Sequence, residues 1–367
     1  MHCLRGTWAA VRVRWAWFEI VAIAIAVAVG LWHPPAAWVE QHYTNGFYSA
    51  LDPALRAITG LVPFAVGDAL LLAAVAALIA MWTIGLRMPG RRWKRVPPLA
   101  LRTLAGLAIV FVWFEGFWAL NYGRVPIADK VIVSRSAVDS DTVNAFADRV
   151  VRMLDANVVE AHAVQPSEAD VRRALQPTFE AAIHRLGDEQ PFGLPNVKPT
   201  IFDLMLGTTG DSGFMDPWTH EVNLYSGQLF FERPSTFAHE WAHAAGFADE
   251  SEANYVSVLA CINSPLALAR YSGWLLVWFN LPSDVHVTAR ARRQVVLDVE
   301  AIKARYQRQV QPAVARAQQA AYDRYLRANR VKQGIDSYRL FVRWMTGATY
   351  DAQGLPVVRP DPAAPAR

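Results

Sequence analysis

Three long apolar runs occupy the first third of the chain and define its first predicted elements. They cover residues 17–36, 61–86 and 101–120, and each approaches the roughly 20 residues that an α-helix needs to cross a bilayer. We therefore predict a membrane domain over residues 1–120 with three transmembrane helices. The small residues that follow the first run also fit a cleaved signal peptide, but two further spans behind it favour a retained anchor.

Basic residues predict how these helices are oriented. Three arginines precede the first run, and six basic residues fill the connection 87–102, whereas residues 32–60 carry only Arg56 as a Lys or Arg. Because basic residues accumulate on the cytoplasmic side, the N-terminus and this second connection are expected in the cytoplasm. Everything after residue 120 is then expected to be extracytoplasmic.

Beyond residue 120 the pattern becomes that of a soluble α+β domain. Apolar residues follow the helical period over residues 136–163, and short β-rich pieces separated by Gly, Pro and Asp follow over residues 191–231. The chain becomes helical again from residue 235. We place this domain at residues 121–353 and expect the Pro/Ala-rich residues 354–367 to form a disordered tail.

Composition narrows the possible partners and cofactors. The two cysteines, Cys3 and Cys261, are predicted on opposite sides of the membrane, so neither an intrachain disulfide nor a Cys-ligated metal site is available. Much of the basic excess is the orienting charge beside the apolar runs, and it requires no nucleic acid. The lipid bilayer is the partner that composition predicts.

The sequence His239-Glu240-Trp-Ala-His243 is the candidate for chemistry. On a helix the two histidines lie one turn apart on the same face, where both can bind one Zn²⁺, and Glu240 can reach a water on that metal. Zinc lowers the pKa of such a water, and the glutamate accepts its proton during attack on a carbonyl. A buried helix that carries these three residues without a metal would leave polar groups without partners, at a cost of several kcal/mol.

The third zinc ligand has three candidates shortly after the motif. Glu250 begins E-x-x-A-N, a spacing similar to that of gluzincin-like peptidases, in which the Glu binds zinc and the residue at the position of Asn254 steadies a ligand histidine. Glu252 is the alternative. Asp249 completes the H-E-x-x-H-x-x-G-x-x-D spacing of metzincin-type sites and ranks last. Each of these acids would also suit the N-terminus of a helix.

The segment 220–231, just upstream of the motif, is expected to supply an edge strand. Zincins bind substrate along such a strand, where an extended peptide adds by main-chain hydrogen bonds. The same residues also fit an ordinary hairpin strand without a ligand.

Several segments resemble an uncharacterised bacterial family of membrane-anchored H-E-x-x-H proteins, known only as a domain of unknown function. The matching segments are LNYGR after the third apolar run, VKPTIF, HEWAHAAGF, ESEANY, LAC and YDRYLRANRVKQGIDSY. They are scattered over most of the chain beyond residue 120. The resemblance implies a zinc-peptidase-like fold and variation at the position of Asp249, but it implies no particular substrate.

Together these observations predict a mainly α membrane protein with a zincin-like extracytoplasmic domain in the bacterial inner membrane. The expected activity is zinc-dependent hydrolysis of a peptide or protein substrate in the cell envelope. Two alternatives stay open: a non-catalytic sensor or assembly protein with a structural zinc, and a metal-dependent hydrolase of a non-peptide envelope substrate. A closed structural site has four protein ligands, so a non-ligand acid such as Glu240 favours the enzyme.

Overall fold

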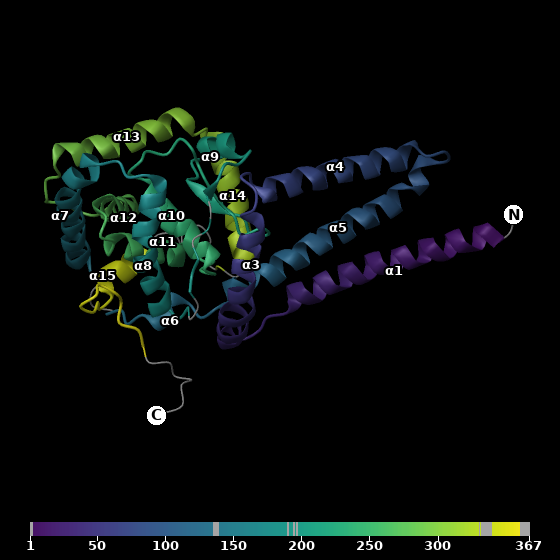
Figure 1. Ribbon diagram of the computed structural model, residues 1–367, viewed down its shortest axis with the longest axis horizontal. Coiled ribbons are helices and arrows are strands. Elements are labelled where there is room, and N and C mark those ends of the chain that lie inside the picture. Colours follow the sequence, from purple (N-terminus) through teal and green to yellow (C-terminus); the bar gives the residue numbers. More distant parts are fainter. Residues whose placement is uncertain are drawn as a thin grey trace, which may run out of the picture.

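The computed structural model describes residues 3–134, 139–188, 191–193, 195, 197–329, 331 and 340–359, with side chains from Ala16 onward. Within these ranges the protein is mainly helical. A group of long helices projects from one side of a helical domain (Figure 1). The connecting helices are α2 (Ala36–Trp38), η1 (Val39–Tyr48), α3 (Ser49–Thr59), η2 (Arg92–Lys94), η3 (Ala119–Gly123) and α6 (Ile127–Lys130).

The projecting group consists of α1 (Cys3–Leu31), α4 (Val66–Arg87) and α5 (Val96–Phe117). Two helical segments, Val66–Arg87 and Arg92–Phe117, are long and apolar enough to cross a membrane. A third candidate is bent by 112° between Ala16–Leu31 and Ala36–Thr59. The protein therefore has two candidate spans, or up to three if the bent pair is counted as one.

The boundaries of these helices differ from those expected. The first helix ends at Leu31 rather than near residue 36, because Pro34 and Pro35 follow and proline cannot continue a helix. The second begins at Val66 rather than residue 61, since Gly60 and Pro63 lie in the preceding turn. Sequence hydropathy alone locates an apolar run but not the point at which its backbone stops being helical.

Buried polar contacts attach the start of α4 to the domain. The Glu221 carboxylate accepts hydrogen bonds from the backbone N–H groups of Val66 and Gly67, and Lys198 forms an ion pair of 2.6 Å with the same carboxylate. The next residue, Asp68, accepts a hydrogen bond of 2.8 Å from the N–H of Ile201. Free N–H groups at a helix N-terminus favour a carboxylate, which explains why Glu221 is held there.

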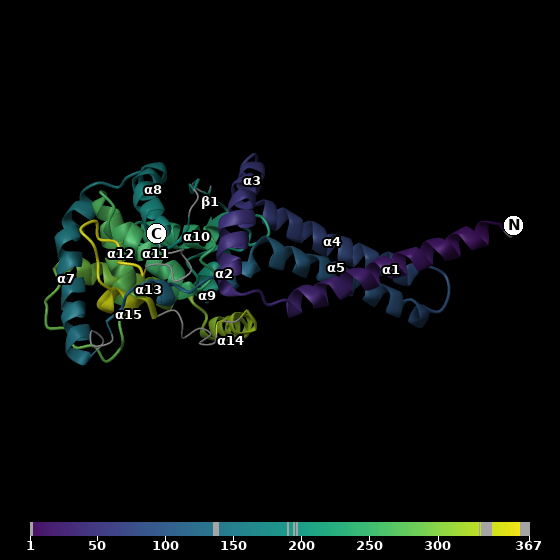
Figure 2. The same cartoon turned by 90° about the horizontal axis from the view of Figure 1, so that it is seen from below.

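The domain is built around α10 (Arg233–Ala244) and α11 (Glu250–Ile262), which α12 (Ala267–Asn280) and α8 (Glu168–Arg185) cover. Helix α7 (Ser140–Ala163) packs on α12 at the side of the domain farthest from the projecting helices (Figures 1 and 2). Twelve of the thirteen residues of α11 are buried. The remaining helices are α9 (Asp203–Thr209), α13 (Arg293–Gln309), α14 (Pro312–Ala328) and α15 (Leu340–Gly347).

A small sheet of three short strands lies beside α10, in the order β1–β3–β2. β1 (Val197–Lys198) runs parallel to β3 (Val222–Leu224), and β2 (Gly213–Met215) runs antiparallel to it. The expectation of an edge strand within residues 220–231 is therefore wrong, because β3 is the central strand. The edge strand next to the motif helix is β2, which precedes β3 in the sequence.

The end of the described chain is packed rather than free. Val358 forms a bridge with Val131, and the N–H of Arg359 donates a hydrogen bond of 2.7 Å to the carbonyl of Lys130. Residues 357–359, expected in the tail, thus pair with backbone at the start of the domain. Residues 360–367 of the predicted tail lie outside the described residues.

Candidate metal centre

The helix that carries the motif ends immediately after the second histidine. Pro234 lies in the first turn of α10, where its missing N–H removes no helical hydrogen bond. After Ala244 the chain turns at Gly246, whose φ of +81° is the left-handed conformation that glycine adopts without strain. A Cβ at Gly246 would come within 2.9 Å of the Asn121 side chain. The turn therefore suits glycine both in conformation and in space.

Helix α11 begins four residues after Gly246, and Asp249 caps it. The Asp249 side chain accepts hydrogen bonds from the N–H groups of Ser251 and Glu252. This cap starts the helix at Glu250 and leaves that residue in the first turn, facing α10. The Asp249 side chain is thus used to cap the N-terminus of α11.

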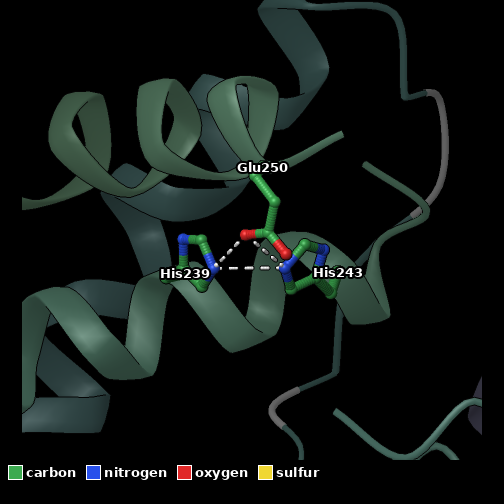
Figure 3. Close-up of side chains that lie close together, drawn as sticks. All are labelled: His239, His243 and Glu250. Atoms are coloured by element: carbon green, nitrogen blue, oxygen red, sulfur yellow. Dashed lines mark hydrogen bonds and ion pairs between the residues drawn. The ribbon is translucent and has the colours of Figure 1, made fainter. Parts of the chain in front are cut away.

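Three side chains from these two helices converge on one point (Figure 3). The Nε2 atoms of His239 and His243 lie 3.1 Å apart, and Oε2 of Glu250 lies 3.1 Å from the first and 3.4 Å from the second. The three ligand atoms fall within 4.8 Å of one another. Among the described residues, this is the one group of three or more His, Cys, Asp or Glu side chains that can hold a metal ion in this way.

Hydrogen bonding and charge prepare these groups for a cation. His243 Nδ1 lies 2.9 Å from the carbonyl of Phe247, so this nitrogen donates and Nε2 faces Glu250. Burial lowers the pKa of His243, but the Glu250 carboxylate, the Glu240 carboxylate and the Phe247 carbonyl together outweigh burial and raise this pKa to about 9. Burial raises the pKa of Glu250, yet the two imidazoles hold it well below its usual value. Two histidines and one carboxylate form a ligand set that Zn²⁺ takes in hydrolases, and zinc binding would release the proton that this raised pKa leaves on His243.

Glu240 is buried on the neighbouring position of α10, and burial raises its pKa. Its Oε2 atom has no hydrogen-bond partner among the described residues. The backbone N–H of Met215 in β2 lies near this side chain and partly offsets the rise in its pKa. A Cβ at Gly213 would lie 3.2 Å from Glu240 Oε1, so the strand approaches the carboxylate closely because it has glycine there.

The other acidic candidates lie away from the histidines. Glu252 accepts a hydrogen bond of 2.7 Å from the N–H of Ile127, at the start of α6. Burial, followed by the nearby charge of Asp249, raises the pKa of Glu252 to about 7. Asn254 is buried one turn after Glu250 and lines the same cavity as the histidines. Its predicted role of steadying a ligand histidine stays a prediction.

Tyr322 is a site residue that sequence reasoning missed. It lies on α14, and its hydroxyl donates a short hydrogen bond to Oε1 of Glu250, the carboxylate oxygen that does not contact His243. The ring of Tyr325, one turn later, stacks on the ring of Tyr322 with centroids 5.5 Å apart. The pair of tyrosines within a charged amphipathic helix was the available signal, but nothing in the spacing connected it to the motif.

The cluster opens into a cavity of about 990 Å³. One wall is formed by β2 and the residues just before it, and another by α14. His239, Glu240, His243 and Glu250 all line this cavity. The ligand cluster and Glu240 therefore line a space that can admit a substrate.

Fold and site together define a class of protein. It is mainly helical, with two or three candidate membrane spans and one His-His-Glu cluster among its described residues. The chain belongs to the family described as "Protein of unknown function (DUF3810)", which matches residues 43–346. No curated protein and no solved structure matches the chain.

Proposed function

We propose that this protein is a membrane-anchored, zinc-dependent metallopeptidase. The observation that carries the proposal is the convergence of His239, His243 and Glu250 beside a fourth group, Glu240, which has a buried oxygen without a partner in the described part of the chain. The same four side chains line one cavity. A purely structural zinc site would give no reason to bury the Glu240 carboxylate next to three metal ligands.

The ligand set supports zinc in a catalytic rather than a closed site. His239, His243 and Glu250 supply three donor atoms, and the adjoining cavity leaves room for water and substrate at a fourth position. When bound, zinc would polarise the scissile carbonyl and lower the pKa of a water molecule. Tyr322 orients Glu250 by donating to its other oxygen.

Glu240 is the general base in this proposal. Its free Oε2 accepts the proton of the attacking water, and its raised pKa favours the later transfer of that proton to the leaving amine. The Met215 N–H lies near the carboxylate, and Oε2 has no hydrogen-bond partner among the described residues. Amide hydrolysis needs both transfers, which one carboxylate can perform in turn.

The edge strand β2 supports a polypeptide as the substrate. Residues 213–215 line the cavity and belong to a strand at the edge of the sheet. An extended peptide can add to such an edge by main-chain hydrogen bonds, which would carry its scissile bond past α10.

Glu240→Gln tests the proposal directly. This substitution keeps the volume and removes no zinc ligand, so we expect unchanged zinc content and melting temperature, with peptide cleavage reduced by about 10² to 10⁴. Glu300→Gln, an exposed change on α13, is the matched control and should leave cleavage unchanged. The measurement is zinc per chain, thermal unfolding and cleavage of a proteome-derived peptide library by the full-length protein.

A cellular assay separates an enzyme from a protein with a structural zinc. The catalytic proposal requires that Glu240→Gln fails to restore any growth phenotype of a deletion strain. Full restoration by a Glu240→Gln protein that still binds zinc would contradict catalysis and favour a structural metal.

A further inference from the structure

The cavity shares a wall with a candidate membrane span. Phe114 and Trp118, from the last turn of α5 and the residue just after it, line the cavity together with the histidines. The Trp118 indole N–H donates a hydrogen bond of 3.2 Å to the carbonyl of His243. One side chain thus connects the end of a candidate span to a candidate zinc ligand.

A second wall of the cavity lies between two candidate spans. Pro217 and Trp218 line the cavity, and the loop that carries them reaches both helices. The Trp218 ring lies 5.7 Å from that of Phe114 in α5. On the other side, a Cβ at Gly67 in α4 would overlap the carboxylate of Asp216. The loop therefore fills the space between the domain ends of α4 and α5, which diverge toward the domain (Figure 1).

The domain cannot move away from these helices without breaking buried contacts. Glu221 holds the N-terminus of α4, and its partner Lys198 also donates to the carbonyls of Thr59 and Phe64. The Lys198 and Glu221 side chains are 4% and 2% exposed. Moving the domain away from α4 would leave both buried charged groups without their backbone partners at residues 59–67, which is unfavourable and fixes the position of the cavity relative to α4.

The surface around the start of α4 is apolar and exposed. Leu204 in α9 is 79% exposed, Leu61 before α4 is 83% exposed, and Phe64 is 52% exposed. Helices α3, α9 and α14 lie on the side of the domain from which the long helices project (Figures 1 and 2). Because this surface is continuous with a span whose apolar window is 0% buried, the occupant it fits is the bilayer itself.

We infer that the cavity opens at the bilayer surface, and that the substrates are membrane-anchored polypeptides hydrolysed close to the point where they leave the membrane. This inference rests on the proposed peptidase function and adds the substrate class. Aromatic residues at the cavity suit this location, because Trp and Tyr gather at the interface between lipid and water. A polypeptide held in the same bilayer needs only a few residues to reach Glu240 from its anchor.

The position of the cavity at the bilayer surface is tested first, and this test needs no substrate. In a Cys3→Ala background, Leu204→Cys and Val159→Cys carry a small environment-sensitive fluorophore, while the buried Cys261 stays unlabelled. Val159 is 63% exposed on α7, the helix farthest from the membrane helices, and serves as the control. In proteoliposomes with lipids brominated near the headgroup, we expect quenching at residue 204 but not at residue 159. Equal lack of quenching at both sites would overturn the inference.

The substrate class is tested with a molecular ruler. Full-length wild type and Glu240→Gln are reconstituted with single-span reporter proteins whose long unstructured segment follows the membrane anchor, and with the same segments in soluble form. Cut positions are mapped by mass spectrometry. Because an extended chain advances about 3.3 Å per residue, we expect Glu240-dependent cuts within about ten residues of the anchor.

The outcomes separate this inference from the proposed function. Cuts spread evenly along anchored segments, or cuts in soluble segments alone, would leave the peptidase proposal standing but overturn the membrane-proximal substrate class. No Glu240-dependent cut in either form would count against the peptidase proposal, and the substrate class would fall with it. Quenching at residue 204 would in that case still place the cavity at the bilayer.

Discussion

At the scale of single residues, each ring nitrogen of His243 has a separate contact. Nδ1 meets the carbonyl of Phe247 at 2.9 Å, whereas Nε2 faces His239 and Glu250. The first contact selects the tautomer and directs the second nitrogen toward the cluster. In metal-binding histidines one ring nitrogen is commonly held by a hydrogen bond while the other faces the metal, so this division of contacts supports the proposed zinc site.

The ranking of Glu250, Glu252 and Asp249 as the third zinc ligand gives the first prediction at this scale. We expect about one zinc per chain in the wild type, and Glu250→Gln should weaken zinc binding far more than Glu252→Gln or Asp249→Asn. The reason is geometric, since Glu250 faces the histidines while Glu252 bonds to Ile127. Zinc content and competition with a chelator measure the ranking. If Glu252→Gln lost the most zinc, the third ligand would have to be reassigned.

Tyr322 provides a second prediction at the residue scale. Tyr322→Phe removes the hydroxyl that orients Glu250, and loss of such a contact typically lowers metal affinity by about 10- to 100-fold. Tyr325→Phe is the matched control on the same helix, because its hydroxyl contacts Tyr122. Chelator competition should therefore separate the two variants. Equal zinc affinity in both would show that Tyr322 packs against the site without supporting it.

At the scale of elements, the junction between α4 and the domain depends on Gly67, which has no side chain. Gly67→Ala would push a methyl group into the Asp216 carboxylate, and we expect a loss of about 1–3 kcal/mol in the free energy of unfolding. Gly106→Ala in α5 is the control, because its Cβ meets nothing within 4 Å among the described atoms. It should be neutral or stabilising, since alanine favours a helix by about 1 kcal/mol over glycine. Thermal unfolding in detergent measures both, and equal melting temperatures would disprove this account of the junction.

The motif helix and its neighbour could be predicted from the sequence because their signals are local. Four-residue spacing placed His239 and His243 on one face, and Asp249 is a residue type that caps a helix at its N-terminus. The edge strand could not be predicted, because the order of β1, β3 and β2 depends on a parallel pairing between distant segments. Tyr322 was missed for a similar reason, since it lies 72 residues from Glu250 and reaches it only through the packing of α14.

At the scale of the whole molecule, the candidate membrane helices and the domain are joined by buried contacts. The family match begins at residue 43, before α4, and continues to residue 346, so it includes both helices that pass as candidate spans together with the metal cluster. Glu221 and Trp118 bind across the same boundary. A protein whose helices served only as a tether would need neither contact, and this coupling is what places the proposed active site at the membrane.

The side of the membrane on which the domain works follows from charge alone and is the last prediction. The connection between α4 and α5 carries Arg91, Arg92, Lys94 and Arg95, and such clusters remain in the cytoplasm. Alkaline phosphatase folds only outside the cytoplasm of bacteria, where its disulfides can form. A fusion after Tyr122 should therefore be active and one after Arg95 inactive, with immunoblotting to confirm equal expression. The reverse pattern would place the candidate metal centre in the cytoplasm and would exclude substrates of the cell envelope, whereas the distance of the cavity from the bilayer would be unchanged.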